Sequence, residues 1–92
     1  MTLEAQFLNP TEIGRELEKI TGNKISGMQV NRLLQAIQLQ CKVANVWEPT
    51  ILGQRLSVIL PYTGKNNHSG FQLKWSTDVI ELLKRHLEPD IF

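Results

Sequence analysis

The fold is decided by residues 9–38, which read NPTEIGRELEKITGNKISGMQVNRLLQAIQ. Asn9 can accept a hydrogen bond from the free amides of a first helical turn, and Glu12 can accept one from the amide of Asn9 in return. Pro10 suits the first helical position because no donor is needed there. Apolar residues then follow at helical spacing: Ile13, Leu17 and Ile20. We therefore predict a helix over residues 10–21 with these three side chains buried, ended by Gly22 in a left-handed conformation.

The same signals recur at Ser26, which forms a second predicted capping box with Gln29. The apolar positions that follow are again at helical spacing: Val30, Leu33, Leu34 and Ile37. They predict a second helix over residues 27–38, with this face buried. Because only residues 22–25 separate the two helices, the pair is typical of a helix-turn-helix.

After residue 38 the apolar period changes to two, which is typical of strands. Residues 39–43 and 46–48 predict a short hairpin that turns at Ala44 and Asn45, followed by a brief helical turn near Gly53. Residues 56–62 and 71–75 predict a longer hairpin around a polar loop, residues 63–70. Ser76 can cap a last helix over residues 77–87. This order predicts an α+β fold, a winged helix-turn-helix with two N-terminal helices, a short hairpin, a longer hairpin and a C-terminal helix.

Length and composition set further bounds. A chain of 92 residues predicts one domain, residues 1–92, whose ends at 1–7 and 88–92 are expected to fray. Its hydrophobic content of 41% and charged content of 21% are typical of a globular protein. No apolar run is long enough to span a bilayer. We therefore expect a cytoplasmic protein with no membrane partner.

Few residues could carry catalysis or hold a metal ion. Cys41 is the one cysteine, and its strand pattern predicts a buried thiol rather than a nucleophile. His68 and His86 have no third ligand at metal spacing, and the basic middle of the chain lacks paired carboxylates. The aromatic residues alternate with polar ones, which predicts core positions rather than stacking platforms: Trp47, Tyr62, Phe71 and Trp75. The sequence therefore predicts no enzyme, no metal and no cofactor.

The charge distribution is uneven although the net charge is only +1. Residues 22–76 hold six basic side chains against one acid, Glu48, whereas both ends of the chain are acidic. The second predicted helix carries no acid at all, so phosphate would not be repelled there. A basic middle between acidic ends is the pattern expected of a surface that faces a polyanion. Six dispersed cations that merely solvate the surface would give the same numbers.

The exposed side of the second helix suggests specific contacts to duplex DNA. Side-chain amides can pair with adenine and guanidinium groups with guanine in the major groove, and the first part of such a helix reaches the bases. The predicted base readers are Gln29, Asn31 and Arg32. The other predicted DNA-binding residues come from the same helix, its approach and the two hairpin loops: Lys24, Gln35, Lys42, Asn45, Lys65, Asn66, Asn67 and His68. For the second loop, a mobile hairpin loop without a dedicated role is an equally good interpretation.

Short motifs extend over residues 8–87: Pro10-Thr11-Glu12-Ile13-Gly14, Ile25-Ser26, Val30-Asn31, Leu33-Leu34, Leu39-Gln40, Trp47-Glu48-Pro49-Thr50, Gly53, Thr63-Gly64-Lys65, His68-Ser69-Gly70 and Leu73-Lys74-Trp75. Together they resemble small winged helix-turn-helix domains of bacteriophages and mobile elements, such as those at the C-terminal end of phage antirepressors. The resemblance implies a phage or prophage regulator in a bacterial host, acting on DNA or on another regulator. The chain departs from such domains in its longer connection over residues 21–25 and in Gln38, where they often have glycine.

Two functions follow from these features. The first is double-stranded DNA binding in the regulation of transcription, as a homodimer because one short helix contacts too few bases. The second is a protein-interaction module that sequesters or modulates a host or phage regulator. The modest net charge, the long connection and an apolar tail at Ile91 and Phe92 favour this alternative. RNA binding is a third hypothesis.

Overall fold

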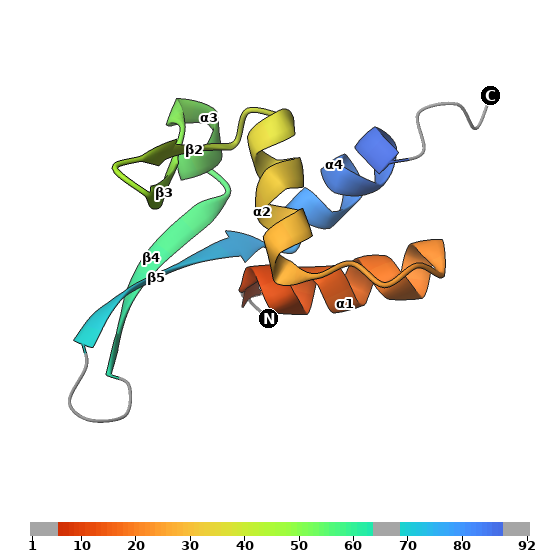
Figure 1. Ribbon diagram of the computed structural model, residues 1–92, viewed down its shortest axis with the longest axis horizontal. Helices are drawn as coiled ribbons and strands as arrows, with labels where there is room; N and C mark the ends of the chain where they lie inside the picture. The colour runs from red at the N-terminus through yellow and green to blue at the C-terminus, as the bar shows by residue number, and fades with distance from the viewer. Residues whose placement is uncertain (1–5, 64–68, 88–92) are drawn as a thin grey trace, which may run out of the picture.

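The computed structural model describes residues 6–63 and 69–87 and shows an α+β arrangement (Figure 1). Within these residues the elements are β1 (Phe7–Leu8), α1 (Pro10–Thr21), α2 (Gly27–Ala36), β2 (Gln40–Val43), β3 (Val46–Pro49), α3 (Ile51–Gln54), β4 (Ser57–Thr63), β5 (Ser69–Ser76) and α4 (Asp78–Leu87). No helix in this part of the chain combines the length and the apolar character that a membrane span requires.

Both predicted capping boxes are present. The amide of Glu12 donates to Asn9 Oδ1 at 2.8 Å, and the amide of Asn9 donates to Glu12 Oε1 at 2.9 Å. In α2 the amide of Gln29 donates to Ser26 Oγ at 3.2 Å, and the amide of Ser26 donates to Gln29 Oε1 at 2.8 Å. Gly22 ends α1 with a φ of 77°, as its position predicted. Local sequence therefore fixes where both helices begin and where the first one ends.

The second helix is shorter than the sequence predicted. It ends at Ala36 rather than at residue 38, because Gln38 adopts a left-handed conformation with a φ of 65°. The amide of Leu39 then donates back to the carbonyl of Leu34 at 2.9 Å. Thr50 holds the same segment from the other side, since its hydroxyl donates to the carbonyl of Gln38 at 2.7 Å. This link places the β2–β3 hairpin directly after α2.

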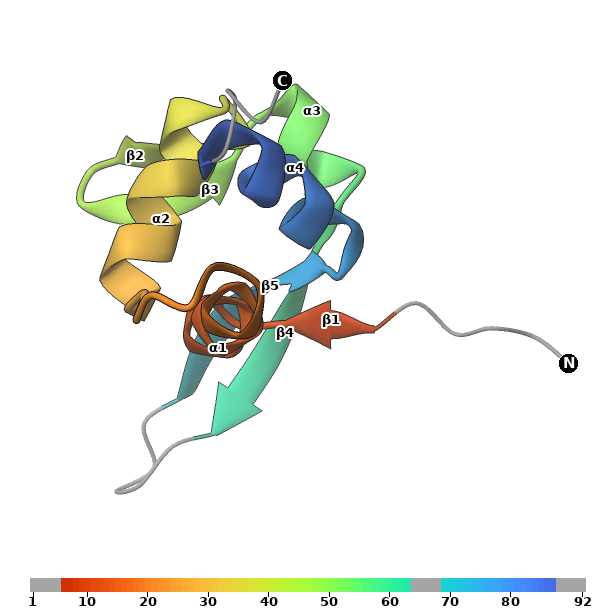
Figure 2. The ribbon, with the colours of Figure 1, turned by 90° about the vertical axis from the view of Figure 1, so that its right-hand side faces the viewer.

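The strands form two separate antiparallel sheets. One is the two-stranded β2–β3 hairpin, in which Lys42 lies opposite Trp47. The other has the order β1-β5-β4, and its β4–β5 hairpin projects away from the helices (Figures 1 and 2). In β1, Phe7 pairs with Ser76 and Leu8 pairs with Trp75. The prediction that residues 1–7 fray is therefore wrong for Phe7, which strand pairing holds in place, while residues 1–5 and 88–92 lie outside the described residues.

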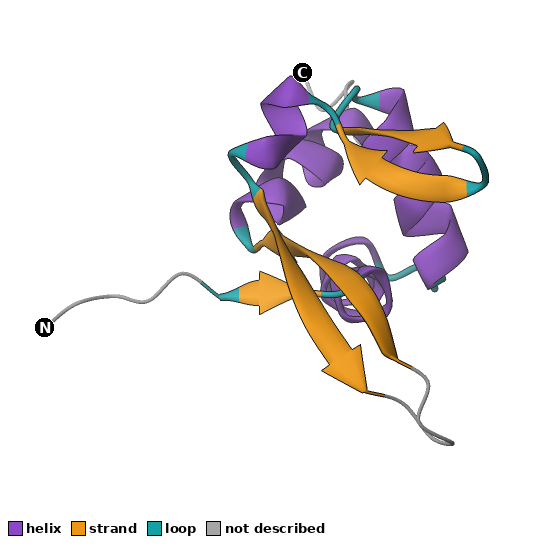
Figure 3. Ribbon diagram, turned by 90° about the vertical axis from the view of Figure 1, so that its left-hand side faces the viewer, coloured by secondary structure: helices purple, strands orange, loops and turns teal. Residues whose placement is uncertain are grey.

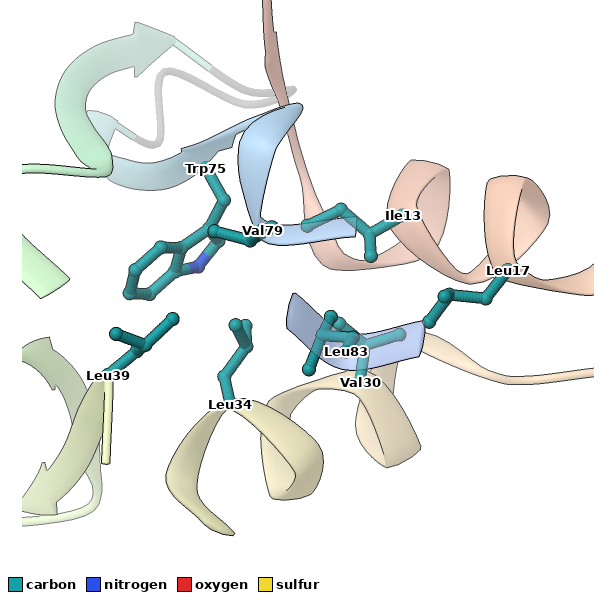
Figure 4. Close-up of a cluster of buried hydrophobic side chains, with 8 residues drawn as sticks. All are labelled: Ile13, Leu17, Val30, Leu34, Leu39, Trp75, Val79 and Leu83. Carbon is teal, nitrogen blue, oxygen red and sulfur yellow. The ribbon is translucent and has the colours of Figure 1, made fainter. Parts of the chain in front are cut away.

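The core lies where α1, α2 and α4 meet the base of β5 (Figure 4). Its buried side chains come from all four elements and from the residue before β2: Ile13, Leu17, Val30, Leu34, Leu39, Trp75, Val79 and Leu83. Trp75 is fully buried, which confirms the core position predicted for it. The apolar faces of the three long helices and Trp75 therefore form one core cluster.

Several side chains that were predicted to be buried are exposed. Phe71 is 77% exposed because the β4–β5 hairpin leaves the body of the molecule, so that only its base is covered. Cys41 is also exposed, since Gln40 is the one buried residue of β2. Ile20, in the last turn of α1, is also exposed, and Trp47 is half-buried. In each case the apolar period was predicted correctly, but no neighbouring element covers that position completely.

Candidate nucleic-acid interface

A groove lies between the start of α1, the first half of α2, the β2–β3 hairpin and β5. Figure 3 shows these elements from the side on which both hairpins lie. The groove consists of two hollows that share four residues: Pro10, Asn31, Trp47 and Gln72. The outer hollow, of about 740 Å³, is also lined by Asn9, Thr11, Gly27, Met28, Arg32 and Lys42. The inner hollow, of about 520 Å³, is also lined by Gln40, Val46, Phe71, Leu73 and Trp75.

Two helices begin at the outer hollow. Residues of the first turn of α1 and of the first turn of α2 both line it. The two turns are in close contact, because a Cβ added to Gly27 would lie 2.9 Å from Thr11 Oγ1. Free amides and the aligned peptide dipoles give a helix start a partial positive charge. The start of α2, whose first turn has no acid, therefore places positive potential on the hollow, whereas at α1 the Glu12 carboxylate already caps the amide of Asn9.

Two cations add to this potential from opposite sides. Arg32 comes from α2 and Lys42 from β2, and both line the outer hollow. The ammonium group of Lys42 lies 5.1 Å from the centre of the Trp47 ring, a cation–π contact that holds it beside the groove. No acidic residue is among those that line either hollow. An anion in the outer hollow would therefore be attracted by Arg32 and Lys42, although the Glu12 carboxylate lies next to Asn9 at its edge.

The acidic side chains point elsewhere. Glu48 pairs with Cys41 in the hairpin register, so it lies on the opposite face from the Lys42–Trp47 pair. Glu12 and Glu16 of α1 line a different hollow with Arg15 and Lys19. There Glu16 is already paired with Lys19 at 2.8 Å. Glu16 thus lies away from the groove, whereas the Glu12 carboxylate also caps Asn9 at the groove's edge.

The three predicted base readers differ in how free they are. Arg32 is exposed and makes no ion pair with another described residue. Gln29 is exposed too, but its Oε1 accepts the capping bond from Ser26. Asn31 is half-buried, and its Oδ1 accepts a hydrogen bond from Gln40 Nε2 at 3.0 Å. A bidentate contact to adenine through either amide would use an oxygen that already accepts one hydrogen bond, whereas Arg32 makes no ion pair with a described residue.

The predicted DNA-binding residues also do not form one patch. Lys24 and Gln29 line a hollow beside Leu87, on the side of α2 that faces the end of α4. Asn31 lies on the other flank of α2, toward the hairpin. Arg32 borders hollows on both flanks. The arginine is therefore the residue that connects the two sides of α2.

The remaining predicted residues have different positions. Gln35 is exposed in the later half of α2, outside the groove. Asn45 is exposed at the tip of the β2–β3 hairpin, where its φ of 65° and that of Ala44, 50°, make the turn. The four predicted residues of the second loop lie outside the described residues: Lys65, Asn66, Asn67 and His68.

The groove also contains residues that the sequence did not indicate as functional. Trp47 and Phe71 were assigned to the core, yet both line the inner hollow. Gln40 is 1% exposed and follows the helix directly, so nothing in the local pattern distinguished it from a surface glutamine. Gln72 comes from a strand that is remote in sequence. Only the non-local placement of β5 beside α2 and the β2–β3 hairpin brings these side chains together.

Comparisons of the chain with protein-family models, with curated proteins and with solved structures find no match. The function is therefore inferred from the groove itself.

Proposed function

We propose that this protein is a winged helix-turn-helix regulator that binds double-stranded DNA. In this proposal α2 enters the major groove, the β2–β3 hairpin lies against the neighbouring phosphates, and a homodimer reads two half-sites. Such a regulator would act in the cytoplasm of a bacterial host. The observation that carries the proposal is that Arg32 and Lys42 line one acid-free hollow at which two helices begin. This arrangement supports phosphate binding next to an exposed helix face.

The outer side of α2 suits a major groove. Met28, Arg32 and Gln35 recur at helical spacing and are all exposed. The helix spans only Gly27–Ala36, about 15 Å at 1.5 Å per residue, so few base pairs are within reach. Arg32 is the side chain best suited to a bidentate contact with guanine, because it is exposed and unpaired among the described residues. We therefore expect most of the sequence preference to come from Arg32.

The test compares two arginines that differ in position. Arg32→Ala should weaken duplex binding by roughly 1–3 kcal/mol and relax the sequence preference. Arg15→Ala removes the same charge from the exposed side of α1, beside Glu12 and Glu16, and should change the affinity by less than about twofold. Affinity is measured by fluorescence anisotropy at two salt concentrations, on duplexes first selected from a random pool. Equal effects of the two substitutions, or an affinity that does not depend on salt, would refute the proposal.

Exposed apolar residues favour a second candidate function, a protein-interaction module for a host or phage regulator. Ile51 is 81% exposed and Leu52 is 61% exposed, and they are adjacent in α3. Neighbouring apolar side chains of this kind are typical of contact surfaces between proteins. Capture of partner proteins from a nuclease-treated bacterial lysate tests this candidate, provided that Ile51→Asp abolishes the capture. Partners that are lost with the nucleic acid would instead support the first proposal.

A further inference from the structure

The inner hollow differs in character from the outer one. Its walls carry aromatic rings from separate elements, namely the half-buried Trp47 of β3 and the exposed Phe71 of β5. Side-chain amides of Asn31, Gln40 and Gln72 lie among them. Aromatic faces combined with amide groups are the surroundings in which proteins bind nucleobases. Its volume of about 520 Å³ lies within the usual range of small-molecule sites.

Two buried polar atoms in these walls have no hydrogen-bond partner among the described residues. Gln40 is 1% exposed, and its Nε2 donates to the carbonyl of Asn31 at 2.9 Å and to Asn31 Oδ1 at 3.0 Å. Those two bonds fix the orientation of the amide and leave Gln40 Oε1 unpaired. Trp75 Nε1 is likewise buried and unpaired. A buried acceptor and a buried donor without partners cost free energy. Both atoms have almost no accessible surface, so a ligand could pair with them only after the side chains around them move.

The outer hollow supplies what a nucleotide needs besides its base. It shares Trp47 and Gln72 with the inner hollow, so a ligand can occupy both. Arg32, Lys42 and the start of α2 attract a phosphate there, and none of the described residues that line either hollow is acidic. The phosphate of a bound nucleotide would then lie in the outer hollow and its base in the adjoining inner hollow.

We propose that the groove binds a nucleotide whose base is unpaired. The base packs against the rings of Trp47 and Phe71 with its polar edge toward the side-chain amide of Gln72, and its phosphate lies between Arg32 and Lys42. The ligand is either a free nucleotide or an unpaired nucleotide of a DNA strand, since both present the same chemistry. The proposed nucleotide site and the proposed duplex binding both use Arg32 and Lys42. The base contacts in the inner hollow belong to the nucleotide site alone.

The experiment uses the 92-residue chain and four probes. These are a single-stranded oligonucleotide, the blunt duplex of the same sequence, a mixture of the four deoxynucleoside monophosphates, and a polyglutamate peptide of equal charge. Binding is followed by intrinsic tryptophan fluorescence, because stacking of a base on Trp47 quenches its emission. We expect the single strand to bind with quenching. Binding of the monophosphates as well identifies a free nucleotide as a ligand, whereas binding of the strand alone assigns the site to polynucleotides.

Phe71→Ala is the decisive variant, because a side chain that is 77% exposed contributes little to the core. We expect it to weaken single-strand binding by about 5- to 100-fold, the usual effect of losing one stacking contact, and to change blunt-duplex binding by less than about twofold. Ile51→Ala is the matched control, since it shortens an equally exposed apolar residue of α3 that does not line the groove. It should change neither affinity.

Each outcome separates this inference from the proposed duplex binding. Duplex binding together with single-strand binding that Phe71→Ala leaves unchanged overturns the inference and keeps the proposed function. Single-strand binding that Phe71→Ala weakens, without any duplex binding, supports the inference and overturns the proposed function. Polyglutamate that binds as tightly as the single strand overturns the inference, because the groove would then recognise charge alone. Absence of nucleic-acid binding overturns both.

Discussion

Among the described residues, three other than glycine have left-handed backbone conformations, and each marks a point where the chain turns sharply. Gln38 ends α2 with a φ of 65°, and Ala44 and Asn45 form the tip of the β2–β3 hairpin. Residues with a Cβ are strained in this region, whereas glycine adopts it at little cost. Gln38 is the best position at which to test this strain, because its hydrogen bonds are made by its backbone. Its amide donates to the carbonyl of Gln35, and its carbonyl accepts from the hydroxyl of Thr50.

We therefore predict that Gln38→Gly stabilises the protein. Relief of the strained φ should outweigh the added freedom of the unfolded chain and raise the free energy of unfolding by about 0.5–1 kcal/mol. Gln35→Gly, three residues earlier within α2, should instead lower it by about 1 kcal/mol, because glycine is a poor helix former. Urea denaturation monitored by circular dichroism measures both. A loss of stability in both variants would show that the strain at Gln38 is negligible.

At the scale of elements, the packing of α1 against the approach to α2 depends on one glycine. A Cβ on Gly14 would collide with the backbone carbonyl of Ile25 and would lie 3.5 Å from a methyl group of Val30. The first helix can therefore approach the connection only if residue 14 has no side chain. The same contact fixes the start of α2, and with it the outer hollow.

Gly14→Ala is accordingly predicted to destabilise the fold although alanine favours helices. The gain in helix propensity is about 1 kcal/mol, but separating α1 from the connection should cost more, for a net loss of roughly 1–3 kcal/mol. Arg15→Ala, at the next and exposed position, should change stability by less than about 0.5 kcal/mol. Thermal unfolding compares the two variants. A Gly14→Ala protein as stable as the parent would mean that the helix pair adjusts without strain.

The elements that local sequence specifies were predicted well. Both capping boxes, the stop at Gly22 and the turn at Ala44 and Asn45 are short-range features, and the structure contains all of them. The pairing of Phe7 with Ser76 could not be predicted, because two residues carry no periodic signal and their partners are remote in sequence. For the same reason the sequence assigned exposed positions to the core: a period of two identifies the faces of a strand but not what covers them.

The candidate site was predicted less completely than the fold. Arg32 and Lys42 were identified as cations on the correct elements, and the structure brings both to one hollow. The inner hollow was missed, since it requires β5 to lie beside α2 and the β2–β3 hairpin. The hydrogen bond from Gln40 to Asn31 was missed as well. These residues are nine positions apart, one in α2 and one in β2, and the sequence gives no signal that they are in contact.

At the scale of the whole molecule, the position of the charges matters more than their sum. The net charge is +1, yet none of the described residues that line the groove is acidic, whereas Glu12 and Glu16 of α1 line another hollow. Electrostatic attraction of a polyanion depends on the local potential of the surface it meets, which salt screens within about 10 Å. We therefore expect the effect of an added charge to depend strongly on where it is placed.

Two glutamine substitutions with the same change in net charge test this expectation. Gln72→Glu places a carboxylate where the two hollows meet and should weaken duplex binding by roughly fivefold or more at low salt, through repulsion of phosphate. Gln54→Glu adds the same charge at the exposed end of α3, away from the groove, and should change the affinity by less than about twofold. Gel-shift titrations give both values. Similar losses for the two variants would indicate that only net charge matters.

The most direct test of the central claim is a map of amide chemical-shift changes when a selected DNA duplex is titrated into the isotope-labelled protein. Binding through α2 and the β2–β3 hairpin predicts the largest changes over residues 27–32 and 42–47, and small changes in α3 and α4. Changes concentrated on the exposed apolar residues of α3, or the absence of any change at saturating duplex, would contradict it.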